Sequence, residues 1–414
     1  AWKLAASPRV AKVYCAPGNA GTETFCTNLP ILPNNHAALV AAAQIHKVDL
    51  VVIGPSEPLI MGLADRFLAA GFPVFGPGGA QAVIEGSKVF SKAFMRRHGI
   101  PTARYEVFED LASARAHVHD HWPQGGLVVK TDGLADVQSV VVAETPAAAL
   151  AELERALGAK HYGAAGERII LEERLVGPEA SILAFVDGRH FKRLPTAQDH
   201  KALYEGNRGP NTEGMGAYAP ALGVEPDLED RITREILAPT LLGLAQEGLG
   251  YPGVLFVGIM ITDEGPKVLE YNCRFGDPEA QVTLPGLQTD LVEVIEACLA
   301  GRLDELDLAF DDACYLCVVG ASPGYPGPAE IERRIYGLEA AMRIPQATIF
   351  HAHTRRHECG LLTAGGRVLN VVARGSTLHE AQRQAYRAID RIAFEGGGPH
   401  VRRDVGSQAT GQHG

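Results

Sequence analysis

The sequence KVLEYNCRFGDPE, residues 267–279, holds the side chains best suited to chemistry. Residues 267–272 have the pattern of a β-strand, so Glu270, Asn272 and, if the strand continues, Arg274 lie on one face. A carboxylate and an amide oxygen two residues apart are hard ligands suited to Mg²⁺ bound to nucleotide phosphates. Arg274 could bind phosphate or carboxylate through two hydrogen bonds. The spacing is equally consistent with a solvated strand end that carries a salt bridge.

A second polar segment, TAQDHKALYEGNRGPNTEGMGAY at residues 196–218, is rich in glycine. Its backbone N–H groups could bind an anion, with donors and acceptors from Asp199, His200, Lys201 and Asn211. We expect a loop of about 20 residues without regular structure, which is usually functional or disordered. Aromatic and methionine residues within it favour a packed, functional loop.

Three further charged residues end predicted strands: Lys130 ends one, and Glu172 and Glu173 end another. A lysine in that place could contact a phosphate, but an exposed lysine at a strand end is equally consistent with the pattern.

Histidine and cysteine give weaker indications of a metal site. The pair Cys314 and Cys317 lies in an apolar run without a second pair, so we expect buried structural thiols rather than zinc. The remaining histidine groups fit a strand face or a helix surface better than a metal centre, and they are His351, His353 and His357 with Cys359, and His117, His119 and His121.

The elements that position these residues begin with an α/β segment. Short apolar strands at 11–15, 48–54 and 73–76 alternate with helices at 35–46 and 61–70, which predicts a parallel sheet. Ligands of such sheets lie at the carboxyl ends of the strands, here near Gly18 and Gly54. The usual first strand and its glycine-rich turn would precede Ala1.

The middle and the end of the chain have a different pattern of predicted helices and strands. We expect a helix beginning after Ser87, a β-β-α-β unit over 126–173, a helix over 228–248 and strands at 253–261 and 267–272. The last hundred residues read as strands at 313–320 and 367–373 and a helix over 377–392. We expect the tail from Glu395 to be frayed.

Composition sets limits on function. The 414 residues carry 38 basic and 49 acidic side chains, a net charge of −11, which argues against nucleic acid as a partner. The longest apolar run, residues 254–261, is far shorter than a membrane helix of roughly 20 residues. Seven scattered cysteines favour a reducing cytoplasm over a disulfide framework.

Several motifs, in this order, resemble the glycinamide ribonucleotide synthetase family of the ATP-grasp superfamily. The most specific are GPNTEGMGAYAP at 209–220 and EYNCRFGDPEAQ at 270–281. Supporting matches cover nearly the whole chain, and they are APGNAGT (16–22), VVIGP (51–55), EGSKVFSKAFMRRHGIPTA (85–103), KTDGLA (130–135), ILEERLVGPEAS (170–181), TAQDHK (196–201) and GGRVLNVVA (365–373).

The resemblance implies an α/β and α+β fold in several parts. These are an N-terminal parallel α/β domain over 1–86 that lacks its first strand, an ATP-grasp domain over 87–308 with a mobile lid at about 107–176, and a β-rich domain over 309–414 with a disordered tail. It also implies a cytoplasmic, monomeric ligase that joins glycine to 5-phosphoribosylamine through glycyl phosphate, using ATP with Mg²⁺ or Mn²⁺, in purine biosynthesis.

Roles for single residues follow from the resemblance alone. It implies that Glu270 and Asn272 hold the metal and that Lys88 and Lys130 face phosphate. It places adenine against the backbone of residues 172–175, which include Glu172, Glu173 and Leu175, and the ribose against Glu179. It places Asp199, Lys201, Asn211 and Arg274 along the glycine and phosphosugar side.

The chain departs from the family pattern at sites that handle phosphate. A Gly-Lys-Gly turn of the family is Val137, Gln138 and Ser139 here. The other changes, each at a family motif position, are Ser56, Ala202, Glu205, Asn207 and Glu213. Two alternatives therefore stay open: a degenerate, non-catalytic homologue that serves a partner, and a diverged ligase for another acid or amine.

Overall fold

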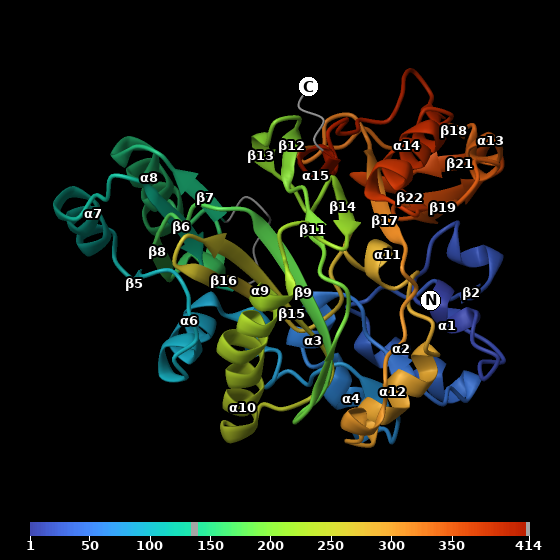
Figure 1. Ribbon diagram of the computed structural model, residues 1–414, viewed down its shortest axis with the longest axis horizontal. Helices are drawn as coiled ribbons and strands as arrows, with labels where there is room; N and C mark the ends of the chain where they lie inside the picture. The colour runs from blue at the N-terminus through green and yellow to red at the C-terminus, as the bar shows by residue number, and fades with distance from the viewer. Residues whose placement is uncertain (134–139, 411–414) are drawn as a thin grey trace. The chain divides into compact units, whose positions relative to one another are not determined.

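The computed structural model describes residues 1–133 and 140–410 (Figure 1). The chain forms two compact units. One unit comprises Ala1–Val48, Lys192–Gly223 and Phe275–Gly414, and the other comprises Asp49–Phe191 and Val224–Arg274. Within the described ranges, no helix is both long enough and apolar enough to cross a membrane.

The unit that contains residues 49–191 has a four-stranded antiparallel sheet of order β5-β8-β6-β7. Its strands are Tyr105–Phe108 (β5), Ile169–Glu173 (β8), Leu127–Thr131 (β6) and Val140–Ala143 (β7). Helices α7 (Leu111–Asp120) and α8 (Pro146–Leu153) pack on it around a shared apolar core. Their first turns are capped by the side chains of Asp110 and Thr145. The predicted β-β-α-β unit is confirmed.

A second sheet in this unit is built on three long antiparallel strands. They are β9 (Glu179–Asp187), β15 (Pro252–Thr262) and β16 (Gly265–Asn272), with β15 in the middle. The longest apolar run of the sequence lies in β15, and it is buried as a strand, as predicted. The predicted helix over 228–248 is present as α9 (Pro226–Ile232), a π-helical stretch (Thr233–Leu237) and α10 (Ala238–Gln246).

The rest of this unit contains a short parallel pair and several helices. Strands β3 (Val51–Val52) and β4 (Val74–Phe75) pair in parallel, as expected, but each has two residues. The helices are α3 (Ser56–Ile60), α4 (Leu63–Ala69), α5 (Val83–Gly86) and α6 (Lys88–Arg97). The side chain of Ser87 caps α6 by accepting a hydrogen bond from the amide of Phe90, as the sequence predicts.

The other unit is organised around a five-stranded antiparallel sheet of order β11-β14-β17-β22-β19. Its strands are Gln198–Asp199 (β11), Gly216–Ala219 (β14), Cys314–Ala321 (β17), Arg367–Gly375 (β22) and Ala347–His351 (β19). Helix α14 (Leu378–Ile389) packs against β17 and β22 (Figure 1). The helix predicted over 377–392 is thus present, and its apolar side chains lie in this core.

Smaller elements complete this unit. The parallel pair β1 (Tyr14–Cys15) and β2 (Thr27–Asn28) is shorter than the strand expected at 11–15. The hairpin of β20 (Thr354–His357) and β21 (Gly360–Thr363) follows β19, and β18 (Ile335–Tyr336) pairs with β23 (Ala393–Phe394). The helices are α1 (Trp2–Ala5), α2 (His36–His46), α11 (Ala280–Thr283), α12 (Leu291–Leu299), α13 (Leu338–Met342) and α15 (Ser407–Thr410), and β10 (Phe191–Arg193) spans the boundary of the two units.

The prediction of a structureless loop at 196–218 is wrong. This segment contains β11, β14 and the hairpin of β12 (Ala202–Tyr204) and β13 (Arg208–Asn211). The hairpin turn has left-handed backbone at Gly206 (φ 68°) and Asn207 (φ 56°), two residue types that accept this conformation. Polar, glycine-rich composition here marks tight reversals of the chain rather than absence of structure.

The prediction of a frayed tail from Glu395 is also wrong for the residues up to Val405. His400 pairs with Ala321 in an antiparallel bridge, and Val405 is fully buried. Arg402 is 1% exposed, which makes it one of the largest fully buried side chains. A charged side chain needs internal partners to be buried in this way, and glycine content alone gives no sign of them.

Candidate functional site

A buried cluster of charged side chains joins helix α6 to strands β6 and β8 in the unit that contains residues 49–191. Glu172 on β8 is 2% exposed and lies between two lysines. Its carboxylate oxygens are 3.1 Å from Nζ of Lys92 and 3.0 Å from Nζ of Lys130. Lys92 also donates to Oγ1 of Thr102 at 2.7 Å. Two ammonium groups against one carboxylate leave an excess of positive charge beneath the surface of this unit.

Burial lowers the pKa of Lys88 and Lys92, the two lysines of α6. It lowers the pKa of Lys92 to about 8, although Glu172 opposes the shift. Burial also lowers the pKa of Lys88, and there the carboxylate of Glu270 is the main opposing charge. Lys88 and Lys130 repel each other, so an anion bound between them would be stabilised by both.

The first turn of α6 is joined to the end of β6 by Asp132. Its carboxylate accepts hydrogen bonds from Oγ of Ser87 at 2.9 Å and from the amide of Val89 at 3.1 Å. Arg168 pairs with the same carboxylate at 2.5 Å. These contacts hold Lys88, the first residue of α6, next to the carbonyl of Gly133, at 3.5 Å. A cavity of about 670 Å³ is lined by residues of this region, among them Ser87, Asp132, Gly133 and Arg168.

Strand β16 presents Glu270 and Asn272 on one face, as predicted. Gly258 lies opposite Glu270 on β15, and a Cβ atom there would come within 3.3 Å of the Glu270 side chain. Arg274 follows the end of the strand and reaches back, with Nη2 3.4 Å from Oδ1 of Asn272. One carboxylate and one amide oxygen side by side form a donor set that could hold Mg²⁺ or Mn²⁺.

Two residues that precede α6 in the sequence, Ser56 and Glu85, also hold the guanidinium of Arg274. Its Nε donates to Oγ of Ser56 at 2.6 Å and lies 3.2 Å from Oε1 of Glu85. The other oxygen of Glu85 accepts from the amide of Cys273 at 2.9 Å. The change at Ser56 therefore supplies a hydroxyl that orients Arg274.

The segment after β8 holds the other predicted nucleotide residues. Glu173 is half-buried and accepts from Nε of Arg104 at 2.7 Å. Burial would raise the pKa of Glu173, but the hydrogen bonds from Arg104 lower it below its ordinary value. Leu175 lies in the connection between β8 and β9, and Glu179 is the first residue of β9. The neighbouring Val176 is 75% exposed, so this connection offers an apolar surface together with backbone groups.

The candidates Asp199, Lys201 and Asn211 lie in the other unit, close together on one pair of hairpins. Asp199 is on β11 opposite Ala217, and Asn211 at the end of β13 is opposite Ala202. The carbonyl of Lys201 accepts from the amide of Thr212 at 2.7 Å. The structure brings these three residues together.

The departure at Glu213 does not leave an uncompensated charge. Its Oε2 is 3.2 Å from Nε of Arg367, and Arg367 also donates to the carboxylate and the carbonyl of Asp277. Asn207, another of these departures, accepts a hydrogen bond from the buried Arg402. The departures at Val137, Gln138 and Ser139 lie outside the residues that the structure describes.

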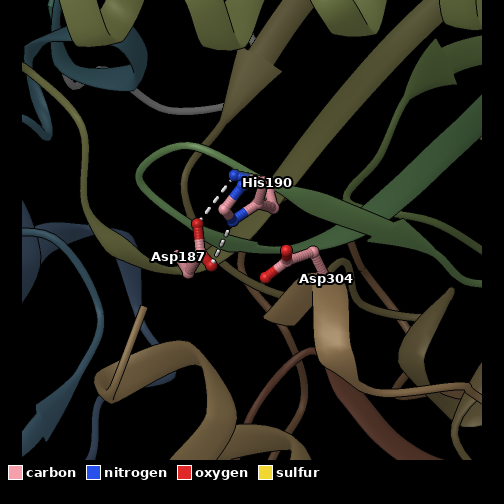
Figure 2. Close-up of side chains that lie close together, drawn as sticks. All are labelled: Asp187, His190 and Asp304. Carbon is pink, nitrogen blue, oxygen red and sulfur yellow. Dashed lines mark hydrogen bonds and ion pairs between the residues drawn. The ribbon is translucent and has the colours of Figure 1, made fainter. Parts of the chain in front are cut away.

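The remaining cysteines and histidines have local structural contacts. Cys317 is fully buried in β17, and Cys314 is partly buried at the start of that strand. His117 and His121 stack on each other at the end of α7, with ring centroids 4.9 Å apart. In the turn after β9, Asp187 accepts hydrogen bonds from the amide of His190 at 2.7 Å and from its ring at 3.0 Å (Figure 2).

Sequence reasoning missed several residues that organise the site. They are Ser56, Glu85, Asp132 and Arg168 around α6, and Arg367 and Arg402 in the other unit. Lys92 is four residues after Lys88, on the same face of α6, and this spacing was the available signal for a second inward lysine. For Arg367 and Arg402, the composition of the strand and of the C-terminal tail gave no sign that the side chains are buried.

His200 gives a prediction for stability against pH. Its ring accepts from the amide of Gly406 at 3.3 Å through Nε2, and burial, assisted by Arg402 and opposed by Asp404, lowers the pKa of His200 to about 4. Between pH 6.5 and 4 the unfolded chain binds a proton that the folded protein excludes, so folding stability falls as pH falls. The loss is about 1.4 kcal/mol per pH unit from this group.

Urea unfolding at pH 7, 6, 5 and 4.5 measures this effect. The variant His200→Gln keeps an acceptor and cannot titrate, so its stability should fall less steeply over this window than that of the wild type. His119→Gln, at an exposed histidine, is the control and should keep the wild-type slope. Equal slopes for wild type and His200→Gln would contradict the assignment.

Two sheets, with buried lysines on α6 and β6 and with carboxylate and amide oxygens on β16, form the fold of an ATP-grasp protein. The biotin carboxylase of Campylobacter jejuni has this fold, with a TM-score of 0.69, 12% identity and coverage of 94% of this chain and 87% of that chain. Models of the phosphoribosylglycinamide synthetase N domain, ATP-grasp (A) domain and C domain match residues 1–85, 86–280 and 315–408. The chain belongs to this phosphoribosylglycinamide synthetase family.

Relatives match the chain along nearly its whole length. A phosphoribosylamine–glycine ligase of Allochromatium vinosum is 48% identical over 412 residues, which are 99% of this chain and 95% of the relative. One of Vibrio cholerae is 44% identical with the same coverage. The crystal structure of the phosphoribosylamine–glycine ligase of Thermotoga maritima is similar with a TM-score of 0.81 and 32% identity, and the match covers 97% of this chain and 96% of that chain.

Proposed function

We propose that this protein joins glycine to 5-phosphoribosylamine at the expense of ATP, through glycyl phosphate, in purine biosynthesis. The products are glycinamide ribonucleotide, ADP and phosphate. The observation that carries the proposal is the match to phosphoribosylamine–glycine ligases along 99% of the chain. The positive charges of Lys88 and Lys130, near the strand that carries Glu270 and Asn272, support the proposal, because the reaction brings a carboxylate and a triphosphate together.

ATP would supply the phosphoryl group that activates glycine. Its metal ion would neutralise negative charge on the phosphates. In this proposal Glu270 and Asn272 hold Mg²⁺ or Mn²⁺, and Lys88 and Lys130 contact phosphate oxygens. The donor set fits, since both groups offer oxygen and the lysines have an excess of positive charge over Glu172.

The base and the ribose bind along the connection from β8 to β9. The side chain of Glu172 is turned inward to Lys92 and Lys130, so the backbone of residues 172–175 is what remains to contact adenine. Glu173 and Leu175 lie on this stretch, and Glu179 follows it at the start of β9, where its carboxylate would accept from a ribose hydroxyl.

The acid and the amine are placed by Arg274, Asp199, Lys201 and Asn211. Arg274, held by Ser56 and Glu85, would bind an anionic group of glycine or of the phosphosugar. Lys201 would neutralise phosphate, and Asp199 and Asn211 would accept hydrogen bonds from the amine and the hydroxyl groups. An acyl phosphate hydrolyses in water, so the site must exclude water while the amine attacks.

We also propose that the chain acts as a monomer in the cytoplasm. All seven cysteines are free thiols, which fits a reducing compartment such as the cytoplasm. Light scattering at micromolar concentration should give the mass of one chain, and a dimer mass would contradict this part of the proposal.

ADP release with each substrate omitted in turn tests the proposed function. Release should require glycine and phosphoribosylamine together, the latter formed in the assay from ribose 5-phosphate and ammonia. A degenerate homologue would release no ADP, and a diverged ligase would release ADP only with another acid or amine. Because the family has a lysine between two glycines at these positions, we expect Val137, Gln138 and Ser139 to slow turnover. Restoring glycine, lysine and glycine there should then raise ADP release in the same assay.

A further inference from the structure

The chain after β23 is attached to helix α14 by side-chain contacts with its backbone. The hydroxyl of Tyr386 donates to the carbonyl of Arg402 at 2.8 Å and accepts from the amide of Val405 at 3.0 Å. Gln382 donates to the carbonyl of Val405 at 2.9 Å. These contacts place residues 402–405 on the core of this unit as a fixed structural element.

From this element Arg402 contacts the β12–β13 hairpin. Its Nη1 donates to the carbonyl of Ala202 and to Oδ1 of Asn207, both at 3.1 Å. Its Nε and Nη2 donate to the two oxygens of Asp404, each at 2.7 Å. Asp404 in turn accepts from the amide of Gly206 at 2.9 Å. The guanidinium and the carboxylate together bind one strand and the turn of the hairpin.

Two neighbouring contacts extend this attachment along the same hairpin. The amide of Gly406 donates to Nε2 of His200 at 3.3 Å, and Nε2 of His400 lies 3.2 Å from the carbonyl of Leu203. The backbone from 200 to 207 is therefore held at several points by residues 400–406. Lys201 and Asn211 lie at the ends of this hairpin, and both are candidates to bind the amine substrate and its phosphosugar.

We propose that Arg402 is a positioning residue for the acceptor side of the site. It fixes the β12–β13 hairpin so that Lys201 and Asn211 are preorganised for the amine substrate, and it contacts no substrate itself. A planar guanidinium is required, because four separate acceptors lie around it in one arrangement and an ammonium cannot reach all of them. This inference rests on the proposed function for its kinetic consequence.

The kinetic test compares three variants. Arg402→Met should raise KM for phosphoribosylamine by at least about tenfold, and Asn207→Gly should raise it by about threefold. In both variants KM for ATP should stay within about twofold of wild type. Asn207→Gly suits the left-handed backbone at this position, so it removes the acceptor without straining the turn. Arg402→Lys should fall between Arg402→Met and wild type. Arg403→Met is the matched control, because Arg403 pairs with Asp390 and lies over the ring of Tyr386 rather than donating to the hairpin, and it should match wild type.

Hydrogen–deuterium exchange of the complete chain gives a readout that does not depend on activity. Residues 202–212 should exchange faster in Arg402→Met than in Arg403→Met, while β16 exchanges at the wild-type rate. An inactive wild type would contradict the proposed function, and the exchange comparison would still decide whether Arg402 fixes the hairpin. Unchanged exchange at 202–212, or an unchanged KM for phosphoribosylamine in both Arg402→Met and Asn207→Gly, would overturn the inference.

Discussion

Replacing Glu270 by glutamine and Asn272 by alanine together is expected to abolish Mg²⁺-dependent ATP binding and to lower ADP release by at least about hundredfold. The two side chains are the adjacent oxygen donors on one face of β16, and they lie beside Lys88. Loss of a metal that neutralises a triphosphate removes several kcal/mol of transition-state stabilisation, and about 1.4 kcal/mol corresponds to a factor of ten.

Titration of ATP with and without Mg²⁺ by calorimetry, together with the ADP assay, measures this effect. The control is Asp263→Asn with Glu264→Gln, at the exposed turn that joins β15 to β16, and it removes two charges from the same hairpin at its other end. The control should keep wild-type affinity. Unchanged nucleotide affinity in the Glu270 and Asn272 double variant would show that the metal is held elsewhere.

A large loss of stability is expected when Glu172 is replaced by glutamine. The change preserves shape but leaves the ammonium groups of Lys92 and Lys130 buried with no carboxylate between them. Removing one partner of a buried ion pair costs about 3–5 kcal/mol, because the remaining charge keeps its desolvation penalty. The free energy of unfolding in urea at pH 7 measures the change.

Two variants show whether the cost comes from the buried charges. Lys92→Met combined with Glu172→Gln removes one surplus ammonium, so this double variant should be more stable than Glu172→Gln alone. Glu247→Gln removes the carboxylate of the exposed pair with Arg97 and should cost no more than about 1 kcal/mol. Equal losses for Glu172→Gln and Glu247→Gln would contradict the proposed role of the buried triad.

Periodicity predicted the elements whose side chains meet a core. The strand that carries Glu270, the helix after Ser87 and the helix predicted over 377–392 follow from alternation, capping and helical spacing, and all three are observed. The two-residue strands β1 and β3 were predicted too long, because an apolar run does not show where a hydrogen-bond ladder stops.

Contacts between distant parts of the chain were beyond sequence reasoning. The hairpin at Gly206 and Asn207 was predicted as a loop, since polar, glycine-rich composition occurs in both. The hairpin accepts hydrogen bonds from Arg402, about 200 residues later in a tail that was expected to fray. Likewise, Glu172 was expected to meet the nucleotide, and nothing in its local sequence shows that its carboxylate is enclosed by Lys92 and Lys130.

The most direct test of the proposed ligation is ADP release with glycine labelled by ¹⁸O in its carboxylate. If the carboxylate attacks the γ-phosphate and the amine then displaces phosphate, each inorganic phosphate formed carries one glycine oxygen. Mass spectrometry should therefore find one ¹⁸O atom per phosphate, equimolar ADP and glycinamide ribonucleotide, and no turnover when glycine or phosphoribosylamine is omitted. Phosphate without ¹⁸O, or ADP release that does not need glycine, would contradict the account.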